Sequence, residues 1–169
     1  MELVEFVCDL AQPGTPFPHC WEHTVGSCHA PLALRADWQA QLRQCHQELG
    51  FQHVRFHGLL SDDIGMLVLE QNKVLDSFFN ADQIVDFLLS IGMKPFVELS
   101  FMPKALASGG KTVFKYRGNV TTPRDYRRWA EFIGRVIRHW VDRYGVREVR
   151  RWFFEVWNEP NRAAFWTGT

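Results

Sequence analysis

The apolar positions of this chain follow two spacings, one helical and one typical of buried strands. Stripes with helical spacing run through residues 34–49, 84–91 and 126–144. A glycine closes each stripe: Gly50, Gly92 and Gly145. After each glycine the chain passes through a short spacer into a compact apolar run, which indicates a strand. Repeated alternation of helix and strand predicts an α/β fold, in which right-handed crossovers connect the strands of a parallel sheet.

One of these apolar runs alternates clearly between polar and apolar residues. His53, Arg55 and His57 fall on one face, and Val54 and Phe56 fall on the other. In a closed barrel the apolar pair packs against the helices, which places Arg55 and His57 inside. We expect the barrel strands near residues 21–26, 52–58, 94–101 and 152–158.

The segment between the second strand and the second helix, residues 59–80, is longer than a typical βα loop. Two apolar runs, 66–69 and 74–79, flank the polar residues 71–73. This pattern predicts a small hairpin inserted after the second strand, and we expect it to lie over the carboxyl ends of the strands.

The helix starts carry capping residues. Asn80 has Gln83 three residues later, the spacing of a capping box, and is expected to cap the second helix. Thr122 is expected to cap the third helix, with Pro123 in the first turn, where a missing amide hydrogen costs little. Residues 1–18 begin apolar and become rich in Pro and Gly, and we expect them to pack across the bottom or side of the barrel.

The charge balance excludes two classes of partner. The 169 residues contain 19 Lys and Arg against 19 Asp and Glu, and no basic run occurs. Nucleic acids and anionic membranes attract clustered positive charge, so neither is an expected partner. Residues 1–9 lack the basic start and continuous apolar core of a signal peptide, and no apolar run is long enough to cross a bilayer. We therefore expect a soluble cytoplasmic protein.

The four cysteines include no Cys-x-x-Cys pair, and without a secretory signal we expect reduced thiols. Residues 19–29 contain five nitrogen or sulfur donors, enough for a tetrahedral zinc site. However, strand alternation through residues 21–26 points neighbouring donors to opposite faces. Ordinary strand and loop side chains are the preferred interpretation, so neither a metal nor a cofactor is predicted.

Residues 153–161 (Phe-Phe-Glu-Val-Trp-Asn-Glu-Pro-Asn) change abruptly from an apolar run to an amide, an acid and a proline. Proline cannot donate to a sheet ladder, so Asn158 and Glu159 should lie where the strand ends. Catalytic side chains of parallel barrels collect at the carboxyl ends of the strands. Asn158 and Glu159 are therefore the leading candidates for chemistry.

Asn158-Glu159-Pro160 at a strand end resembles the acid/base motif of the retaining clan A glycoside hydrolases. The longer run 154–161 is most similar to glycoside hydrolase family 39, the family of β-xylosidases and α-L-iduronidases. Three further stretches are similar to the β-xylosidase branch and occur in family order: residues 57–63, 96–109 and 118–123. The resemblance implies a TIM (β/α)8 barrel that hydrolyses terminal β-D-xylosides, with a xyloside or a small oligosaccharide as substrate.

Retaining hydrolysis needs two carboxyl groups about 5 to 5.5 Å apart, one serving as acid and base and the other as nucleophile. The resemblance implies that Glu159 is the acid/base. It also implies that Asn158 hydrogen-bonds the sugar 2-hydroxyl and that His57 contacts the sugar in the −1 subsite. Trp21 and Trp157 are candidates for subsite walls, although an aromatic residue in or beside a strand is more often part of the core.

Two further acids, Glu98 and Glu155, lie inside expected strands, where an isolated charge is costly. Arg55 is the available partner for both across the sheet. We interpret Arg55, Glu98 and Glu155 as a buried ion-pair layer that orients the site from below, in preference to a direct catalytic role.

A TIM barrel typically needs about 250 residues, whereas the sequence ends at residue 169. We therefore expect one partial domain over residues 1–169, the N-terminal half of a barrel with about four βα units. The resemblance places a nucleophilic glutamate at the end of the seventh strand, and nothing in residues 1–169 matches it. Half a barrel exposes strand edges and its inner face, so we expect a second copy or a missing C-terminal half to cover them.

Two alternatives to an enzyme remain open at this point. The first is a sugar-binding module, in which His57, Asn158 and the tryptophans hold a sugar without cleaving it. The second is an interaction fragment that uses its open strand edges. By resemblance the lineage is that of a glycosidase, and the isolated 169-residue chain is expected to be inactive.

Overall fold

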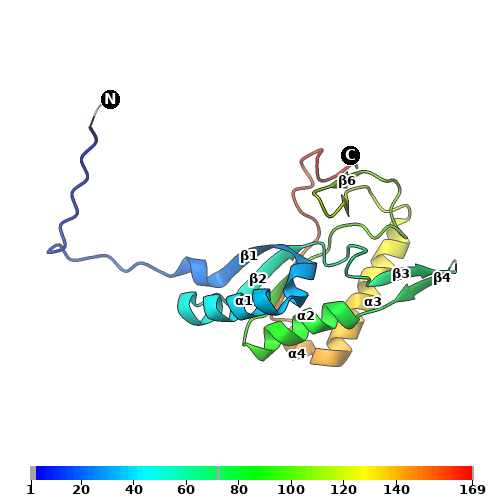
Figure 1. Ribbon diagram of the computed structural model, residues 1–169, viewed down its shortest axis with the longest axis horizontal. Coiled ribbons are helices and arrows are strands. Elements are labelled where there is room, and N and C mark those ends of the chain that lie inside the picture. Colours follow the sequence, from blue (N-terminus) through cyan, green and yellow to red (C-terminus); the bar gives the residue numbers. More distant parts are fainter. Residues whose placement is uncertain (1–2, 72, 169) are drawn as a thin grey trace.

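A four-stranded parallel sheet forms the centre of the computed structural model, which describes residues 3–71 and 73–168 (Figure 1). In spatial order its strands are β1 (Thr24–His29), β2 (His53–His57), β5 (Lys94–Glu98) and β8 (Phe153–Glu155). Each strand pairs in parallel with the sheet strand that precedes it along the chain. Such an order is typical of successive βα units in a barrel wall, and the α/β prediction is confirmed.

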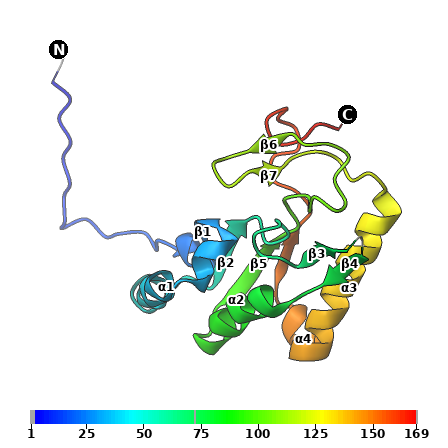
Figure 2. The same ribbon diagram turned by 45° about the vertical axis from the view of Figure 1, so that its right-hand side comes forward.

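Helices cover one face of this sheet (Figure 2). They are α1 (Ala36–Leu49), α2 (Phe79–Ser90), α3 (Tyr126–Tyr144) and the short α4 (Val146–Val149), with two 3₁₀ turns, η1 (Cys20–His23) and η2 (Ala30–Leu34). Val54, Phe56 and Val97 point to this face and are almost fully buried. The opposite face carries the polar side chains of β2 and is partly open, since Phe153 is 41% exposed. The predicted division of β2 into an apolar and a polar face is therefore present.

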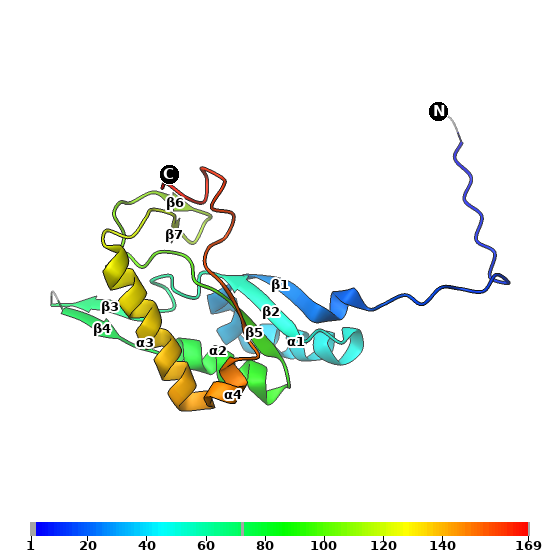
Figure 3. The same cartoon turned by 180° about the vertical axis from the view of Figure 1, so that it is seen from behind.

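Two antiparallel hairpins extend from the sheet. The expected insertion after β2 forms β3 (Leu67–Glu70) and β4 (Lys73–Asp76), but it lies beside α3, where Asp76 pairs with Arg135 at 2.6 Å (Figure 3). Its expected place over the strand ends was wrong. Instead, a second hairpin, made of β6 (Thr112–Val113) and β7 (Gly118–Asn119), lies near the carboxyl ends of the strands. Asn72, part of the predicted turn of the first hairpin, lies outside the described residues.

Both predicted helix caps were wrong. Asn80 lies in the first turn of α2, and its side chain donates to the carbonyl of Ile64 at 2.9 Å, so it ties the helix to the preceding loop. The N-cap of α3 is Asp125, which accepts hydrogen bonds from the amides of Arg127 and Arg128. The helix starts three residues later than the Thr122 cap predicted.

The N-terminal segment also departs from expectation. Its apolar side chains are exposed, as Leu3 (99%) and Phe6 (90%) illustrate, and the segment extends away from the sheet (Figure 1). The first strand begins at Thr24 instead of near Trp21, because residues 20–23 form the 3₁₀ turn η1. None of the helices among the described residues has the length and apolarity needed to traverse a bilayer.

Candidate active site

Arg55 joins two acids on the open face of the sheet. Its Nε and Nη2 atoms donate to the carboxylate of Glu155 at 2.6 and 2.9 Å, and Nη2 lies 2.7 Å from Oε2 of Glu98. The side chain of Glu98 is fully buried, so its charge requires such a partner. The hydrogen bonds to Glu155 raise the pKa of Arg55, while burial opposes them and the charges of Glu98, Glu155 and Glu159 add to the increase.

Glu98 also sets the orientation of His57. The Nδ1 atom of His57 lies 2.7 Å from Oε2 of Glu98. Because a carboxylate only accepts hydrogen bonds, Nδ1 carries a proton, and Nε2 is the ring nitrogen left for a ligand. The hydroxyl of Ser100 donates to the other oxygen of Glu98. Glu98 thus has three donors around it, on Arg55, His57 and Ser100, and these contacts hold its carboxylate in place.

Asn158 is oriented by the same arginine. Its Oδ1 accepts a hydrogen bond from Arg55 Nη2 at 3.0 Å, and the residue is only 7% exposed. With the amide oxygen held in this way, the Nδ2 group is the part of Asn158 that can donate to a ligand. Asn158 can therefore donate a hydrogen bond to the oxygen of a hydroxyl group.

Glu159 stands at the rim, immediately after Asn158. Its side chain is 47% exposed and lies 3.2 Å from Nη1 of Arg162. It is one of the charges that raise the pKa of Arg55, so it lies within electrostatic reach of the buried layer. Its φ is +42°, an uncommon backbone conformation for a residue other than glycine, and such strain is often found at functional sites.

The two tryptophans are not part of this group. Trp21 lies in η1, stacked on His19 with ring centroids 4.3 Å apart, and precedes β1 at the amino ends of the strands. Trp157 is 8% exposed and donates from Nε1 to the carbonyl of Phe165, so it packs inside the loop layer. The structure brings together six of the eight predicted residues: Arg55, His57, Glu98, Glu155, Asn158 and Glu159.

Comparison with known proteins identifies the family. The profile described as Glycosyl hydrolases family 39 matches residues 4–169. The chain belongs to glycosyl hydrolase family 39. It is 58% identical over 151 residues to a β-xylosidase of Caldicellulosiruptor saccharolyticus, covering 88% of this chain and 31% of that protein. It is 46% identical over 154 residues to a β-xylosidase of Geobacillus stearothermophilus, covering 89% of this chain and 31% of that protein.

A solved structure gives the same relationship. The crystal structure of a monomeric β-xylosidase from Caulobacter crescentus CB15 matches with a TM-score of 0.85 and 39% identity, over 93% of this chain and 32% of that one. The chain thus spans about a third of the length of these family 39 relatives. The four parallel strands and the helices that connect them correspond to the N-terminal part of their barrels, so the predicted family and fold are confirmed.

One candidate residue of this family 39 chain was not predicted from the sequence. Phe114 lies in the turn between β6 and β7 with φ +62° and is 45% exposed. Its ring centroid is 5.8 Å from that of His57 and 5.2 Å from that of Tyr116. Gly118 lets the β6–β7 hairpin lie close to Phe101, because a Cβ at this position would clash with the Phe101 ring. Aromatic residues at positions 114 and 116 of a polar loop were the available sequence signal.

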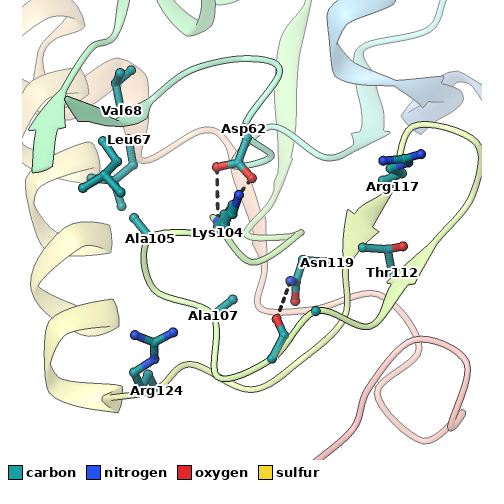
Figure 4. A pocket seen from close by; sticks show the side chains of 13 residues that line it. Asp62, Leu67, Val68, Lys104, Ala105, Ala107, Thr112, Arg117, Asn119 and Arg124 are labelled. Carbon is teal, nitrogen blue, oxygen red and sulfur yellow. Dashed lines mark hydrogen bonds between the residues drawn. The ribbon is translucent and has the colours of Figure 1, made fainter. Parts of the chain in front are cut away.

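A hollow of about 970 Å³ lies between the β3–β4 hairpin and the segment 104–124, and its lining includes none of the predicted site residues (Figure 4). Asp62 points across it to the backbone amide of Lys104, at 3.1 and 3.2 Å, and burial raises the pKa of Asp62. Within residues 3–71 and 73–168, His, Cys, Asp and Glu side chains form no group of three or more that could hold a metal ion.

Proposed function

We propose that this chain supplies the acid/base half of a retaining glycosidase site that hydrolyses terminal β-D-xylosides. Glu159 gives its proton to the glycosidic oxygen as the bond to the leaving group breaks. It then takes a proton from the water that attacks the covalent glycosyl-enzyme. The observation that carries this proposal is the position of Glu159 at the rim, next to an amide whose orientation Arg55 fixes.

The nucleophile in this proposal lies outside residues 1–169. Glu98 and Glu155 are the other acids of the site, but both are held by Arg55, and Glu98 also accepts from His57 and Ser100. A carboxylate whose oxygens already accept hydrogen bonds from neighbouring side chains is a poor nucleophile. Glu98 and Glu155 are better suited to holding Arg55 and His57 in position. The attacking carboxylate therefore comes from the strands that complete the barrel.

The identities to named relatives support a β-xyloside as the substrate, and Asn158 supports binding of a pyranose that carries a 2-hydroxyl. Relatives named β-xylosidase are 58% and 46% identical to this chain, whereas human α-L-iduronidase is 28% identical. The free Nδ2 group of Asn158 can donate to a sugar 2-hydroxyl, and this hydrogen bond strengthens as positive charge develops on the ring.

The partner that we propose is the remainder of the barrel. The edge strand β8 and the residue that follows it expose apolar side chains, since Phe154 is 39% exposed and Val156 is 65% exposed. Exposed strand edges with apolar neighbours are surfaces that another strand covers. A second copy of the chain is the competing occupant, and it would appear as a dimer that shows no xylosidase activity.

The test is hydrolysis of 4-nitrophenyl β-D-xyloside by this chain together with the polypeptide that completes the barrel. We expect turnover with β-xyloside and an approximately 100-fold loss on Asn158→Ala, because a donor used in the transition state is removed. Asn161→Ala, an exposed amide three residues away, is the matched control and should retain activity. A folded, assembled protein that releases no nitrophenol would contradict the proposal.

A further inference from the structure

A second, smaller polar hollow lies among the loops beyond β2, apart from the predicted catalytic group. Its volume is about 200 Å³, and its polar lining consists of Ser61, Asp62, Asp63, Tyr116, Arg117 and Asn119. Asp62, Arg117 and Asn119 also line the larger hollow of Figure 4, so the two are neighbours. At about 30 Å³ per water molecule, the smaller hollow has room for about six waters or one small ligand.

Two hydroxyl groups of this hollow are buried without a partner. Ser61 is 6% exposed, and its Oγ has no hydrogen-bond partner among the described residues. The hydroxyl of Tyr116 is also buried and has no hydrogen-bond partner among the described residues. A buried hydroxyl that has lost its hydrogen bonds to water and has no protein partner is destabilising. Because Ser61 and Tyr116 both line this hollow, a ligand that forms hydrogen bonds with both hydroxyls would remove this cost.

The charges around the hollow favour a neutral ligand. Asp62 and Asp63 disfavour an anion, and Arg117 disfavours a simple cation. Asp62 already accepts from the amide of Lys104, and Oδ2 of Asp63 lies 3.1 Å from Nε2 of His29. This contact occupies Oδ2 only, so the carboxylate of Asp63 keeps Oδ1 to accept from a ligand.

The remaining walls have the mixed character of a sugar site. Met102 supplies an apolar surface. Burial raises the pKa of Tyr116, so its hydroxyl remains a donor at neutral pH. Hydroxyl donors, carboxylate acceptors and an apolar surface together match the hydroxyl groups and C–H faces of a pyranose ring.

We propose that this hollow binds one neutral monosaccharide unit, of the size of xylopyranose, at a site distinct from that of Glu159. Aromatic rings lie between the two sites, because the Phe114 ring centroid is 5.2 Å from that of Tyr116, which lines the hollow, and 5.8 Å from that of His57 in the candidate active site. The neighbouring hollow of Figure 4 has room for further units of a longer chain. The inference takes from the proposed function only the class of sugar.

The test is a titration of the ¹⁵N-labelled chain with D-xylose, followed by amide chemical shifts. We expect saturable shifts at residues 61–63 and 116–119. Ser61→Ala and Tyr116→Phe each remove one hydroxyl, and each should weaken binding several-fold, with a combined loss of about tenfold or more. Tyr144→Phe, which removes a tyrosine hydroxyl from the α2–α3 contact, is the control and should leave the affinity unchanged.

The outcomes separate this inference from the proposed function. Xylose shifts that persist in Asn158→Ala but weaken in Ser61→Ala support the second site. Failure of Asn158→Ala to change activity contradicts the proposed function and leaves the second site intact. Absence of saturable shifts at residues 61–63 and 116–119, an affinity in both hydroxyl variants unchanged from that of the unmodified chain, or displacement of xylose by Ca²⁺ at these residues would overturn the inference.

Discussion

Arg55 connects the four polar groups on which the site depends. It contacts Glu98, Glu155 and Asn158 directly, and through Glu98 it influences His57. The layer is asymmetric, since the side chain of Glu98 is fully buried and that of Glu155 is 27% exposed. Loss of the arginine therefore affects Glu98 most, because water cannot replace the missing partner.

We predict that Arg55→Met lowers the free energy of unfolding by about 3 to 5 kcal/mol, because the buried Glu98 carboxylate loses its arginine and keeps only His57 and Ser100 as donors. Urea unfolding followed by circular dichroism measures this loss. Arg127→Ala is the control, since this arginine is 84% exposed and pairs with Glu131 on the helix surface. The control should cost less than about 1 kcal/mol. Equal losses in the two variants would show that the buried layer has no special role.

Some residue positions were predictable from sequence and others were not. Arg55, Glu98 and Glu155 were found because strand alternation gives their face and the cost of a buried charge requires a partner. Trp21 was misplaced because the strand begins three residues later than expected. Phe114 was missed because the two aromatic residues at 114 and 116 do not reveal that the loop folds back to His57, which depends on positive φ values at Phe114 and Arg117.

Among the elements, the start of α3 gives a clear contrast between sequence and structure. We predict that Asp125→Ala lowers the free energy of unfolding by about 0.5 to 2 kcal/mol, because the amides of Arg127 and Arg128 lose their acceptor. Asp142→Ala, an exposed acid within the same helix, is the control and should have little effect. Thermal unfolding compares the two, and equal effects would contradict the assignment of Asp125 as the cap.

A polar contact joins α2 to α3 and responds to pH. Burial alone would raise the pKa of Asp86, but hydrogen bonds from Arg143 and Tyr144 outweigh it and lower this pKa below the ordinary value of 3.8. Asp86 therefore stabilises the fold fully above about pH 4 and loses this contribution as the pH falls through its lowered pKa.

Asp86→Asn should accordingly destabilise the chain at pH 7, and the difference from the unmodified chain should shrink as the pH falls below about 4. Urea unfolding at several pH values measures this dependence. Asp142→Asn, the same replacement at an exposed position of α3, serves as the control. A difference that is independent of pH would show that the Asp86 carboxylate does not act through its charge.

The elements themselves were easier to predict than their ends. Helix stripes and strand runs gave the order of the βα units, because burial of one face imposes a period on the sequence. The cap at Thr122 was wrong because Asp125 meets the same sequence rule three residues later. The cap at Asn80 was wrong because α2 begins after Phe78, whose side chain makes no capping hydrogen bond. Asn80 bonds to Ile64, and Thr122 lies 2.9 Å from the hydroxyl of Ser108.

At the scale of the whole molecule, the sheet presents an open edge at β8. Val156 follows this strand and is 65% exposed. We predict that the isolated chain self-associates through this edge and that Val156→Lys reduces the association, because a charge opposes edge-to-edge pairing. Val146→Lys, at a position that is 49% exposed in α4, is the control. Sedimentation velocity that shows the same association state for both variants would contradict this use of the edge.

The proposed role of Glu159 as acid/base is tested most directly by the leaving-group dependence of the Glu159→Gln variant in the completed barrel. With 4-nitrophenyl β-D-xyloside we predict a loss of about 10² to 10⁴-fold in turnover. With 2,4-dinitrophenyl β-D-xyloside, whose leaving group needs no proton, formation of the glycosyl-enzyme should persist, and azide should restore turnover because it attacks without a base. Equal losses with both substrates and no response to azide would contradict the account.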